Sequence, residues 1–322
     1  MDAQILRILK SGSATIPEIA AQCHVPEEVI RTRLLKLEEV GFAFTVHPAL
    51  GLNISRTPSQ LVGDLILSGI PEGREPCAIT VYQSTRSTND LAHRAGQTQV
   101  PCPAVFLAEQ QTAGRGRNGR VWESDSGLGL WMSILLVPTL PQIYWPRLTT
   151  AAATLVTLKL RSELKLPVQI KWPNDIWIGS SKLAGIIAET GNSSGGPYAV
   201  LGIGLNVLHT ASDFPPHLQS KATSLNLHLS PPPSRNELAA KLLTALSQLD
   251  EAISTQGFPD ILNQARNLSC VLNQSIDLTF NHEQISGFAM DLNAEGHLVL
   301  RTSEGVERVL HSGEVTHIRP SC

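Results

Sequence analysis

Three arginines and three glycines alternate within one short segment, residues 108–122, which reads AEQQTAGRGRNGRVW. In order they are Gly114, Arg115, Gly116, Arg117, Gly119 and Arg120. Glycine allows positive φ angles and close approach of the backbone to a ligand. A guanidinium presents a planar fork of donors to carboxylate or phosphate. Because glycines are interleaved with the arginines, we expect a hinged loop that closes over a polyanion, rather than a solvated or nucleic-acid-facing surface.

The same segment matches the G-x-G-x-x-G pattern of dinucleotide-binding loops. That pattern is informative only where a helix follows and an acidic residue stands about twenty residues on. The sequence after Gly119 reads VWESDSGLGLWMSILLV, which is rich in strand formers and has no helical period. A helix N-terminus also binds pyrophosphate through its backbone amides, without arginines. We therefore predict that the chain has no Rossmann dinucleotide site.

Length and composition are those of an ordinary globular protein of two or three domains. The chain has 322 residues, of which 42% are hydrophobic and 16% charged, and its net charge of −3 gives no overall basic field for nucleic acid. The cysteines are Cys23, Cys77, Cys102, Cys270 and Cys322. They form no C-x-x-C pair, and nothing near Cys23 and His24 completes a metal set. We expect reduced cysteines and no protein metal site.

The sequence predicts a cytoplasmic protein that does not enter the membrane. Residues 1–12, MDAQILRILKSG, lack the charged start and long apolar core of a signal peptide. The longest apolar run, residues 128–137, is about ten residues long, which is too short to span a bilayer.

Residues 1–62 have the pattern of a helical module followed by a hairpin. Apolar residues recur at helical spacing in three segments. These segments span residues 2–11, 16–25 and 26–41. Pro26 and Gly41 suit the start and end of the third helix, and residues 42–54, FAFTVHPALGLNI, alternate around a turn as a wing would. This order predicts a winged helix-turn-helix domain.

Arg31, Arg33 and Lys36 on the third helix are the candidate DNA contacts. Residues 1–60 hold six Lys and Arg against six Asp and Glu, and Glu27 and Glu28 lie at one end of this helix. Phosphate contacts dominate DNA affinity. Two interpretations therefore stay open: an operator-binding domain, or a helical module with little DNA affinity.

The rest of the chain divides into a mixed segment and an all-strand segment. Residues 63–267 alternate apolar strand-like runs with helical ones, among them a helix over residues 235–253, which predicts an α/β or α+β domain around a mixed sheet. Residues 209–233, rich in Pro, Ser and His, are expected to form a long functional loop. Residues 268–322 show five short strands separated by turn signals, which predicts a small barrel.

Four motifs in this order resemble the bifunctional biotin protein ligase and biotin operon repressor family, the biotin-[acetyl-CoA-carboxylase] ligases. They are STN at 87–89, the arginine loop, KWPNDIWIGSSKLAGIIAE at 171–189 and GIGLNV at 202–207. The resemblance covers the whole chain and implies an α+β multi-domain fold. In that fold a winged helix-turn-helix precedes a catalytic domain with the mixed sheet of class II synthetases, and an SH3-like β-barrel follows.

The resemblance also implies a reaction and its partners. The family joins the biotin carboxylate to the α-phosphate of ATP, releases pyrophosphate, and passes biotin from biotinyl-5'-AMP to a lysine of the biotin carboxyl carrier protein of acetyl-CoA carboxylase. Because an anion must approach an anion, positioning and charge neutralisation are the enzyme's main means. The family further implies operator DNA and a ligand-dependent homodimer as partners, and Mg²⁺ bound mostly by the triphosphate.

Residue by residue, the resemblance implies a biotin site. Its members are Ser87, Thr88, Asn89, Gln111, Gly114, Arg115, Gly116, Arg117, Lys182 and Gly185. For the STN motif, the alternative is the N-cap of the helix that follows, and both roles can hold together. For Gln111, the alternative is a solvated loop side chain.

An ATP site and a catalytic set are implied in the same way. The ATP site comprises Arg117, Arg120, Trp122, Lys171, Asn174 and Asn206. The catalytic set comprises Lys182, Arg115 and Arg117. A flexible ammonium at Lys182 can offset charge as the mixed anhydride forms, although an exposed turn is the more usual place for a lysine. Asp175 is expected only to hold the turn between two strands.

Two alternatives remain on sequence grounds. A lipoate or octanoate ligase shares the catalytic fold, but the R-x-S-G-G-G-A-V stretch typical of those enzymes is absent here. A repressor that senses biotin without ligase activity would not need the arginine loop, Lys171 and Lys182 together.

Overall fold

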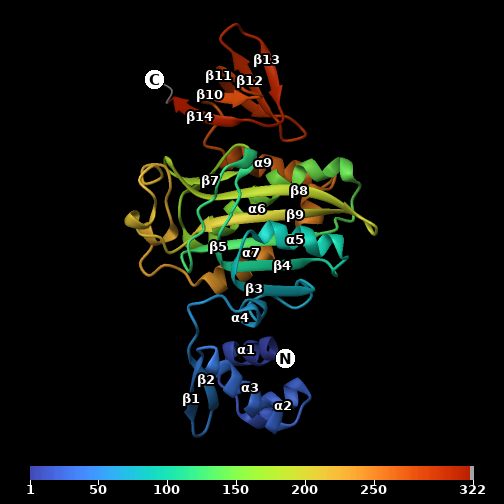
Figure 1. Cartoon of the computed structure of the whole chain (residues 1–322), viewed down its shortest axis with the longest axis vertical. Coiled ribbons are helices and arrows are strands. Elements are labelled where there is room, and N and C mark those ends of the chain that lie inside the picture. Colours follow the sequence, from blue (N-terminus) through green and yellow to red (C-terminus); the bar gives the residue numbers. More distant parts are fainter. Residues whose placement is uncertain (320–322) are drawn as a thin grey trace.

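The computed structural model describes residues 1–319, and its parts follow one another along the longest axis (Figure 1). The N-terminal helices lie at one end, a large sheet with its helices lies in the middle, and a small sheet lies at the other end. No helix in the described range is long and apolar enough to cross a bilayer.

The N-terminal part contains three helices and a hairpin, as the sequence predicts. The elements are α1 (Asp2–Ser11), α2 (Ile16–Cys23), α3 (Glu27–Glu39), β1 (Ala43–His47) and β2 (Gly51–Arg56). Thr15 and Glu18 form a reciprocal capping box at the start of α2, which satisfies free amides of its first turn. Ile5, Ile19 and Ile30 have no exposed surface and come from one helix each. These helices are amphipathic, and their apolar faces meet in one core.

A short helix that the sequence patterns did not predict, α4 (Gly63–Leu67), joins this core to the central one. Its neighbouring residues Leu65 and Ile66 pack into the N-terminal and the central core, respectively. Beside α4, a buried ion pair joins Glu109 to Arg235 at 2.7 Å. Glu109 also accepts the backbone N–H of Leu61, so this pair fixes the connecting segment to the central sheet.

The central part is built on one seven-stranded mixed sheet, as predicted. Its strands are β3 (Ala78–Thr85), β4 (Ala104–Gln111), β5 (Gly129–Leu136), β9 (Gly196–Asn206), β8 (Ser181–Ser193), β7 (Asp175–Ile178) and β6 (Val168–Lys171), in spatial order. Only β3 and β4 pair in parallel. The strand after the arginine loop, β5, runs antiparallel to β4, which confirms that the loop does not belong to a Rossmann unit.

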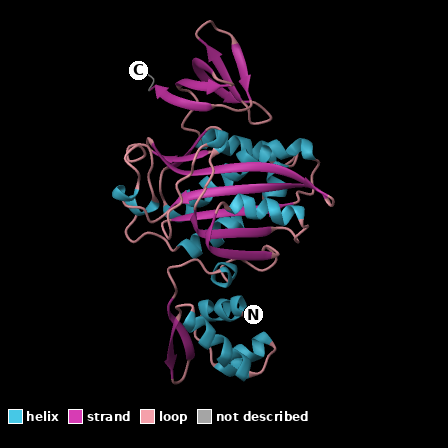
Figure 2. Ribbon diagram, viewed as in Figure 1, coloured by secondary structure: helices cyan, strands magenta, loops and turns pink. Residues whose placement is uncertain are grey.

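Helices cover both faces of this sheet (Figure 2). One face packs against α5 (Thr88–Gln97) through residues such as Phe106, Leu135 and Val200. The other face packs against α6, α7, α8 and α9. It does so through the strand residues next in sequence to those three, because successive side chains along a strand point to opposite faces. These helices are α6 (Leu148–Leu164), α7 (Arg235–Leu246), α8 (Leu249–Ile253) and α9 (Phe258–Leu268).

Two helix predictions need correction. The pattern over residues 235–253 predicted one continuous helix, but the chain turns after Leu246, so that α7 and α8 each bury their own apolar face. The sequence patterns also missed α9, although its apolar residues Phe258, Leu262 and Ala265 have helical spacing and are buried.

The C-terminal part contains the five predicted strands, paired antiparallel in the order β13-β12-β11-β10-β14. They are β10 (Ser275–Phe280), β11 (Glu283–Leu292), β12 (Leu298–Thr302), β13 (Glu307–Leu310) and β14 (Glu314–Arg319). Asn281 and His282 both have positive φ, as a two-residue hairpin turn requires. The turn before β14 brings Gly313 and Glu314 to the central part.

Candidate functional site

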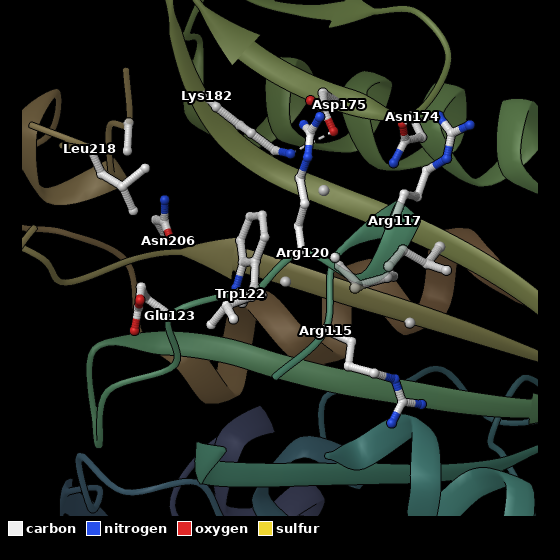
Figure 3. A pocket seen from close by; sticks show the side chains of 18 of the residues that line it. Arg115, Arg117, Arg120, Trp122, Glu123, Asn174, Asp175, Lys182, Asn206 and Leu218 are labelled. Atoms are coloured by element: carbon white, nitrogen blue, oxygen red, sulfur yellow. Dashed lines mark hydrogen bonds and ion pairs between the residues drawn. The ribbon is translucent and has the colours of Figure 1, made fainter. Parts of the chain in front are cut away.

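A cavity of about 590 Å³ lies between the central sheet, the first turn of α5, the arginine loop and the start of β14. This volume is typical of sites for small molecules and cofactors. Figure 3 shows the loop arginines, Lys182 and Asn174 together around the cavity. Residues from strands, a helix, a loop and the C-terminal sheet line it together, so the sequence motifs converge through the tertiary fold.

One side of the cavity is lined by uncharged polar residues, and we call these residues, with Ser133 behind them, the neutral wall: Ser87, Thr88, Asn89, Gln111 and Ser133. The Ser133 hydroxyl, which has no exposed surface, lies 2.7 Å from Thr88 Oγ1 and 2.5 Å from Asn89 Oδ1. Gln111 Oε1 accepts from the backbone N–H of Thr88 at 2.8 Å and from its hydroxyl at 3.1 Å. These side chains are therefore oriented before any ligand arrives.

This geometry bears on the two roles considered for the STN motif, the contact with a ligand and the N-cap of the helix that follows. Ser87 occupies the N-cap position of α5, but its side chain makes no capping hydrogen bond. Its hydroxyl is therefore not committed to the helix, whereas Thr88 and Asn89 are held by the neutral wall. Gln111 is tied to Thr88 and Ser124 and is not a solvated loop residue.

Glycines on adjacent strands form the floor of the cavity. A Cβ atom at Gly202 would lie 2.3 Å from Asn89 Oδ1, and one at Gly204 would lie 2.6 Å from Trp122 Nε1. Gly185 faces Gly204 across the strand pair and contacts the same tryptophan. The absence of side chains at these positions lets Asn89 and Trp122 lie directly on the sheet.

The arginine loop folds back on itself and closes the opposite side of the cavity. Gly116 N–H donates to the Arg120 carbonyl at 2.7 Å, and Trp122 N–H donates to the Gly114 carbonyl at 3.0 Å. Between these bonds the chain turns through Gly119, whose φ of +73° is favourable for glycine. The turn of the loop therefore favours glycine at residue 119.

Each arginine of the loop contacts a different element. Arg115 pairs with Asp90 on α5, Arg117 donates to Asn174 Oδ1 at 2.9 Å, and Arg120 makes a bidentate pair with Glu314 of the C-terminal sheet. Arg115 and Arg120 leave the loop in opposite directions (Figure 3). Burial lowers the pKa of Arg117, and hydrogen bonds from Arg120 lower that of Glu314.

Two lysines line the cavity beside aromatic rings. Lys182 Nζ lies 2.7 Å from Asp175 Oδ1 and 5.1 Å from the centre of a Trp122 ring. Lys171 Nζ lies 4.0 Å from the centre of a Trp177 ring, and burial lowers the pKa of Lys171. Asp175, expected only to hold a turn, instead neutralises Lys182. We call the loop arginines and these two lysines the cationic wall.

The long loop predicted at residues 209–233 borders the cavity and holds Lys182. Its residues Phe214, Pro215 and Leu218 line the cavity. The Lys182 backbone N–H donates to the Lys221 carbonyl at 2.7 Å, and its carbonyl accepts from Thr223 N–H at 2.9 Å. Asn206 Nδ2 also donates to the Thr223 carbonyl, at 3.0 Å.

The structure brings nearly all the predicted small-molecule residues to this cavity. Gly114 lies outside its lining, because the backbone and Ser124 pack against it: a Cβ there would be 2.4 Å from the Trp122 carbonyl oxygen. The predicted DNA contacts lie on α3, away from the cavity (Figure 1). There Arg31 pairs with Glu27 at 3.3 Å, and Arg33 pairs with Asp2 at 3.0 Å.

Several residues of the site were not predicted. They include Ser133, Trp177, Glu189 and Glu314. Ser133 had a detectable signal, since it is a single polar residue in the apolar run WMSILL. Glu189 accepts from Asn89 Nδ2 at 2.7 Å, and hydrogen bonds from His93 and Asn89 hold the pKa of its carboxyl below its usual value. Glu314 had no local signal, because it approaches Arg120 only through the fold.

The mixed sheet thus carries one cavity with a neutral wall and a cationic wall. Such a site defines a protein that binds a ligand, or a pair of ligands, uncharged at one end and anionic at the other. Comparison with known proteins identifies the family. The Biotin/lipoate A/B protein ligase family matches residues 81–206, and the Biotin protein ligase C terminal domain matches residues 271–317.

Individual relatives agree with the family match. The bifunctional ligase/repressor BirA of Bacillus spizizenii is 32% identical over 275 residues, which cover 85% of each chain. The biotin--[acetyl-CoA-carboxylase] ligase of Mycobacterium tuberculosis is 32% identical over 250 residues, 75% of this chain and 89% of the relative. A biotin protein ligase from Aquifex aeolicus, solved in complex with biotin and ATP, superposes with a TM-score of 0.65 at 26% identity, over 76% of this chain and 100% of that one. The chain belongs to the biotin protein ligase family.

Proposed function

We infer that this chain is an ATP-dependent biotin protein ligase, which makes biotinyl-5'-AMP and transfers biotin to a lysine of a biotin carboxyl carrier protein. The observation that carries this function is the meeting of two unlike walls in one cavity. The neutral wall suits the uncharged ureido ring of biotin, and the cationic wall suits its carboxylate and the phosphates of ATP.

In the first step, a carboxylate oxygen of biotin attacks the α-phosphorus of ATP. A new P–O bond forms, the bond to the β-phosphate breaks, and pyrophosphate leaves with its electron pair. Lys182, Arg115 and Arg117 are the residues we assign to offsetting the negative charge that concentrates here. Preorganised cations in a site that excludes water stabilise such charge strongly.

In the second step, the carrier's lysine amine attacks the acyl carbon of biotinyl-5'-AMP. The new C–N bond replaces the C–O bond to phosphate, AMP leaves, and the amine gives up its proton. The arginine loop must retain the reactive adenylate until this amine arrives. We assign that retention to Arg117, which is tied to Asn174 on the strand connection below it.

For ATP, we assign Arg120, Trp122, Lys171, Asn174 and Asn206, all of which line the cavity. Trp122 packs against the glycine floor, where we assign it to border the adenine, and we assign the lysine and arginine cations to the phosphates. The neighbouring loop residues Phe214 and Leu218 would exclude water from the base.

The fold gives Mg²⁺ no cage of its own. Within residues 1–319, no group of three or more His, Cys, Asp or Glu side chains is placed to hold a metal ion. Among the carboxylates that line the cavity, Asp175 and Glu314 are paired with Lys182 and Arg120. We therefore assign the ligands of Mg²⁺ to the phosphates and water, and no step above depends on a protein ligand to the metal.

The experiment that tests the ligase function is ATP–pyrophosphate exchange, supplied in turn with biotin, lipoate and octanoate. We expect exchange with biotin alone. Exchange with lipoate but not biotin would assign the chain to the lipoate branch of the fold, and no exchange with any acid would make it a sensor without ligase activity.

We further propose that residues 1–62 form a winged helix-turn-helix that represses transcription of biotin genes when the adenylate is bound. Support comes from the order of three helices and a hairpin and from the bifunctional ligase/repressor relatives. Lys36, exposed on α3, is the DNA contact we favour, because Arg31 and Arg33 are already ion-paired. A ligand-dependent homodimer would place two such domains on paired half-sites.

A gel shift with the promoter of the host's biotin genes, with and without biotin and ATP, tests this second role. We expect a shift only with both ligands present and a matching increase in sedimentation coefficient. Residues 63–267 and 268–322 are the catalytic and SH3-like domains in this proposal, and a cytoplasmic location remains a prediction from the sequence.

A further inference from the structure

We propose that Glu189 is a positioning residue that joins the neutral wall to the arginine loop; this inference rests on the proposed ligase function. Glu189 lies in β8, four residues after the floor glycine Gly185. It does not line the cavity and has none of the roles assigned above.

Three different groups converge on a single oxygen of this carboxylate. Asn89 Nδ2 donates to Glu189 Oε2 at 2.7 Å, His93 Nε2 lies 3.3 Å from it, and an Arg115 nitrogen lies 3.9 Å away. Asn89 and His93 belong to α5, whereas Arg115 belongs to the loop. Glu189 is thus the point at which a buried substrate-binding amide and a loop cation share one acceptor.

The two interactions differ in kind, so they can be separated. Asn89 is buried, and with its carbonyl oxygen beside the Ser133 hydroxyl its amide plane is fixed at both ends. This bond needs an acceptor but no charge. Arg115 is half-exposed and also pairs with Asp90, so its attraction to Glu189 depends on the negative charge.

The side of α5 that faces away from the ligand also supports Glu189. His93 Nδ1 lies 3.3 Å from the Tyr198 hydroxyl, which itself donates to the His93 carbonyl at 3.2 Å. Tyr198 is buried against the glycines Gly96 and Gly191, where an added Cβ would lie within 2.7 Å of its ring or hydroxyl. This packing holds His93, and through it the carboxylate, so that Glu189 cannot follow the loop when the loop moves.

A pair of substitutions distinguishes the two interactions. Glu189→Gln keeps an acceptor for Asn89 and removes the charge, whereas Glu189→Ala removes both. In Glu189→Gln we expect the KM for biotin to stay within about twofold of wild type, while labelled biotinyl-5'-AMP leaves the protein about threefold to fivefold faster after a chase, as for a half-exposed ion pair. In Glu189→Ala the KM for biotin should rise by about tenfold as well, because Asn89 loses its acceptor.

A double-mutant cycle tests the route through Arg115. In an Arg115→Gln background, Glu189→Gln should no longer change the release rate. Glu163→Gln is the matched control, since Glu163 is likewise a carboxylate in contact with basic side chains, here two lysines, but lies on α6 away from the cavity; it should match wild type in every measurement.

The inference is overturned if Glu189→Gln releases the adenylate at the wild-type rate, or if its full effect persists without Arg115. Equal rises in the KM for biotin in the Gln and Ala variants would also overturn it, because they would mean that charge, not acceptor geometry, holds Asn89. Failure of the ligase function itself would look different: the wild-type chain would then show no pyrophosphate exchange with biotin.

Discussion

The neutral wall and the cationic wall surround one cavity but are held in opposite ways. Ser133 and Thr88 of the neutral wall are buried, and their hydrogen bonds run within the sheet and the first turn of α5. The arginines of the cationic wall lie on a glycine-hinged loop, and Arg115 and Arg120 pair with half-exposed carboxylates of other elements. A neutral network tolerates burial when it is fully bonded, whereas charged side chains remain near water until a charged ligand replaces it.

This contrast indicates a division of labour. The neutral wall is preorganised and should determine which acid binds. The cationic wall is held by exchangeable ion pairs, and it should determine how fast the acid is activated and how long the adenylate is retained. Exposed ion pairs contribute only about 0–1 kcal/mol each, so phosphates can displace them at little cost.

The largest effect is expected at Lys182, because the cationic wall should determine how fast the acid is activated. Lys182→Met keeps the length of the side chain and removes its charge, so the rate of adenylate formation should fall by about 10²–10³-fold, as when a transition-state donor is lost. The KM for biotin should change little. Pyrophosphate exchange measures both, and Lys241→Met, on the surface of α7, is the control.

The next effect is expected at Arg117. Arg117→Gly removes the contact with Asn174 and frees the loop, so biotinyl-5'-AMP should leave the protein about tenfold to a hundredfold faster, as expected for a lost charged hydrogen bond. Released adenylate should then label bystander proteins. A blot for biotin on a mixture of the carrier and an unrelated protein measures this, with Arg308→Gly in the C-terminal sheet as the control. Tight retention and carrier-specific labelling in the Arg117 variant would contradict the loop's assigned role.

A smaller and different effect is expected at Ser133. Ser133→Ala removes the buried hydroxyl that contacts both Thr88 Oγ1 and Asn89 Oδ1, so the KM for biotin should rise by about fivefold to tenfold while the KM for ATP and kcat stay near wild type. Ser162→Ala, on the exposed surface of α6, controls for the loss of a hydroxyl. A change in kcat as large as that in KM would mean that the two walls are not separable.

The smallest effect is a pH dependence at Lys171. Burial lowers the pKa of this ammonium, so it loses its proton at a lower pH than an ordinary lysine does. If its charge binds phosphate, the KM for ATP should rise as pH increases toward that lowered pKa. Lys171→Arg, whose guanidinium stays charged, should delay the rise to higher pH. Coincident pH profiles of KM for ATP in the two proteins would remove Lys171 from the phosphate site.

The two walls were not equally predictable from sequence. The cationic wall could be located because its residues are close together in motifs: Arg115, Arg117 and Arg120 lie in one loop, and Lys171 and Lys182 lie in the one motif at 171–189. Four of the five residues of the neutral wall were found through STN and Gln111. Ser133 was missed because it contacts Thr88 across 45 residues of sequence, and Glu189 because it contacts Asn89 across 100.

The fold shows the same limit. Apolar runs predicted strands of the central sheet, which is covered on both faces, and alternation with turn signals predicted those of the C-terminal sheet. The short helix α4 was missed because five residues carry too little pattern, and its existence depends on two cores that it joins. The break between α7 and α8 was missed because helical propensity continues through it while packing does not.

The sequence by itself determined the chemistry that is present: the arginine–glycine loop, the two lysines, the STN turn and the order of helices, strands and turns. Such features depend on local geometry and on residue type, which a linear pattern carries. Only the tertiary structure decided which of them act together. It placed Ser133 and Glu189 on opposite ends of the Asn89 amide, paired Lys182 with Asp175, and brought Glu314 to Arg120 across 194 residues. Those contacts depend on strand register and on the packing of separate sheets, which no local pattern specifies.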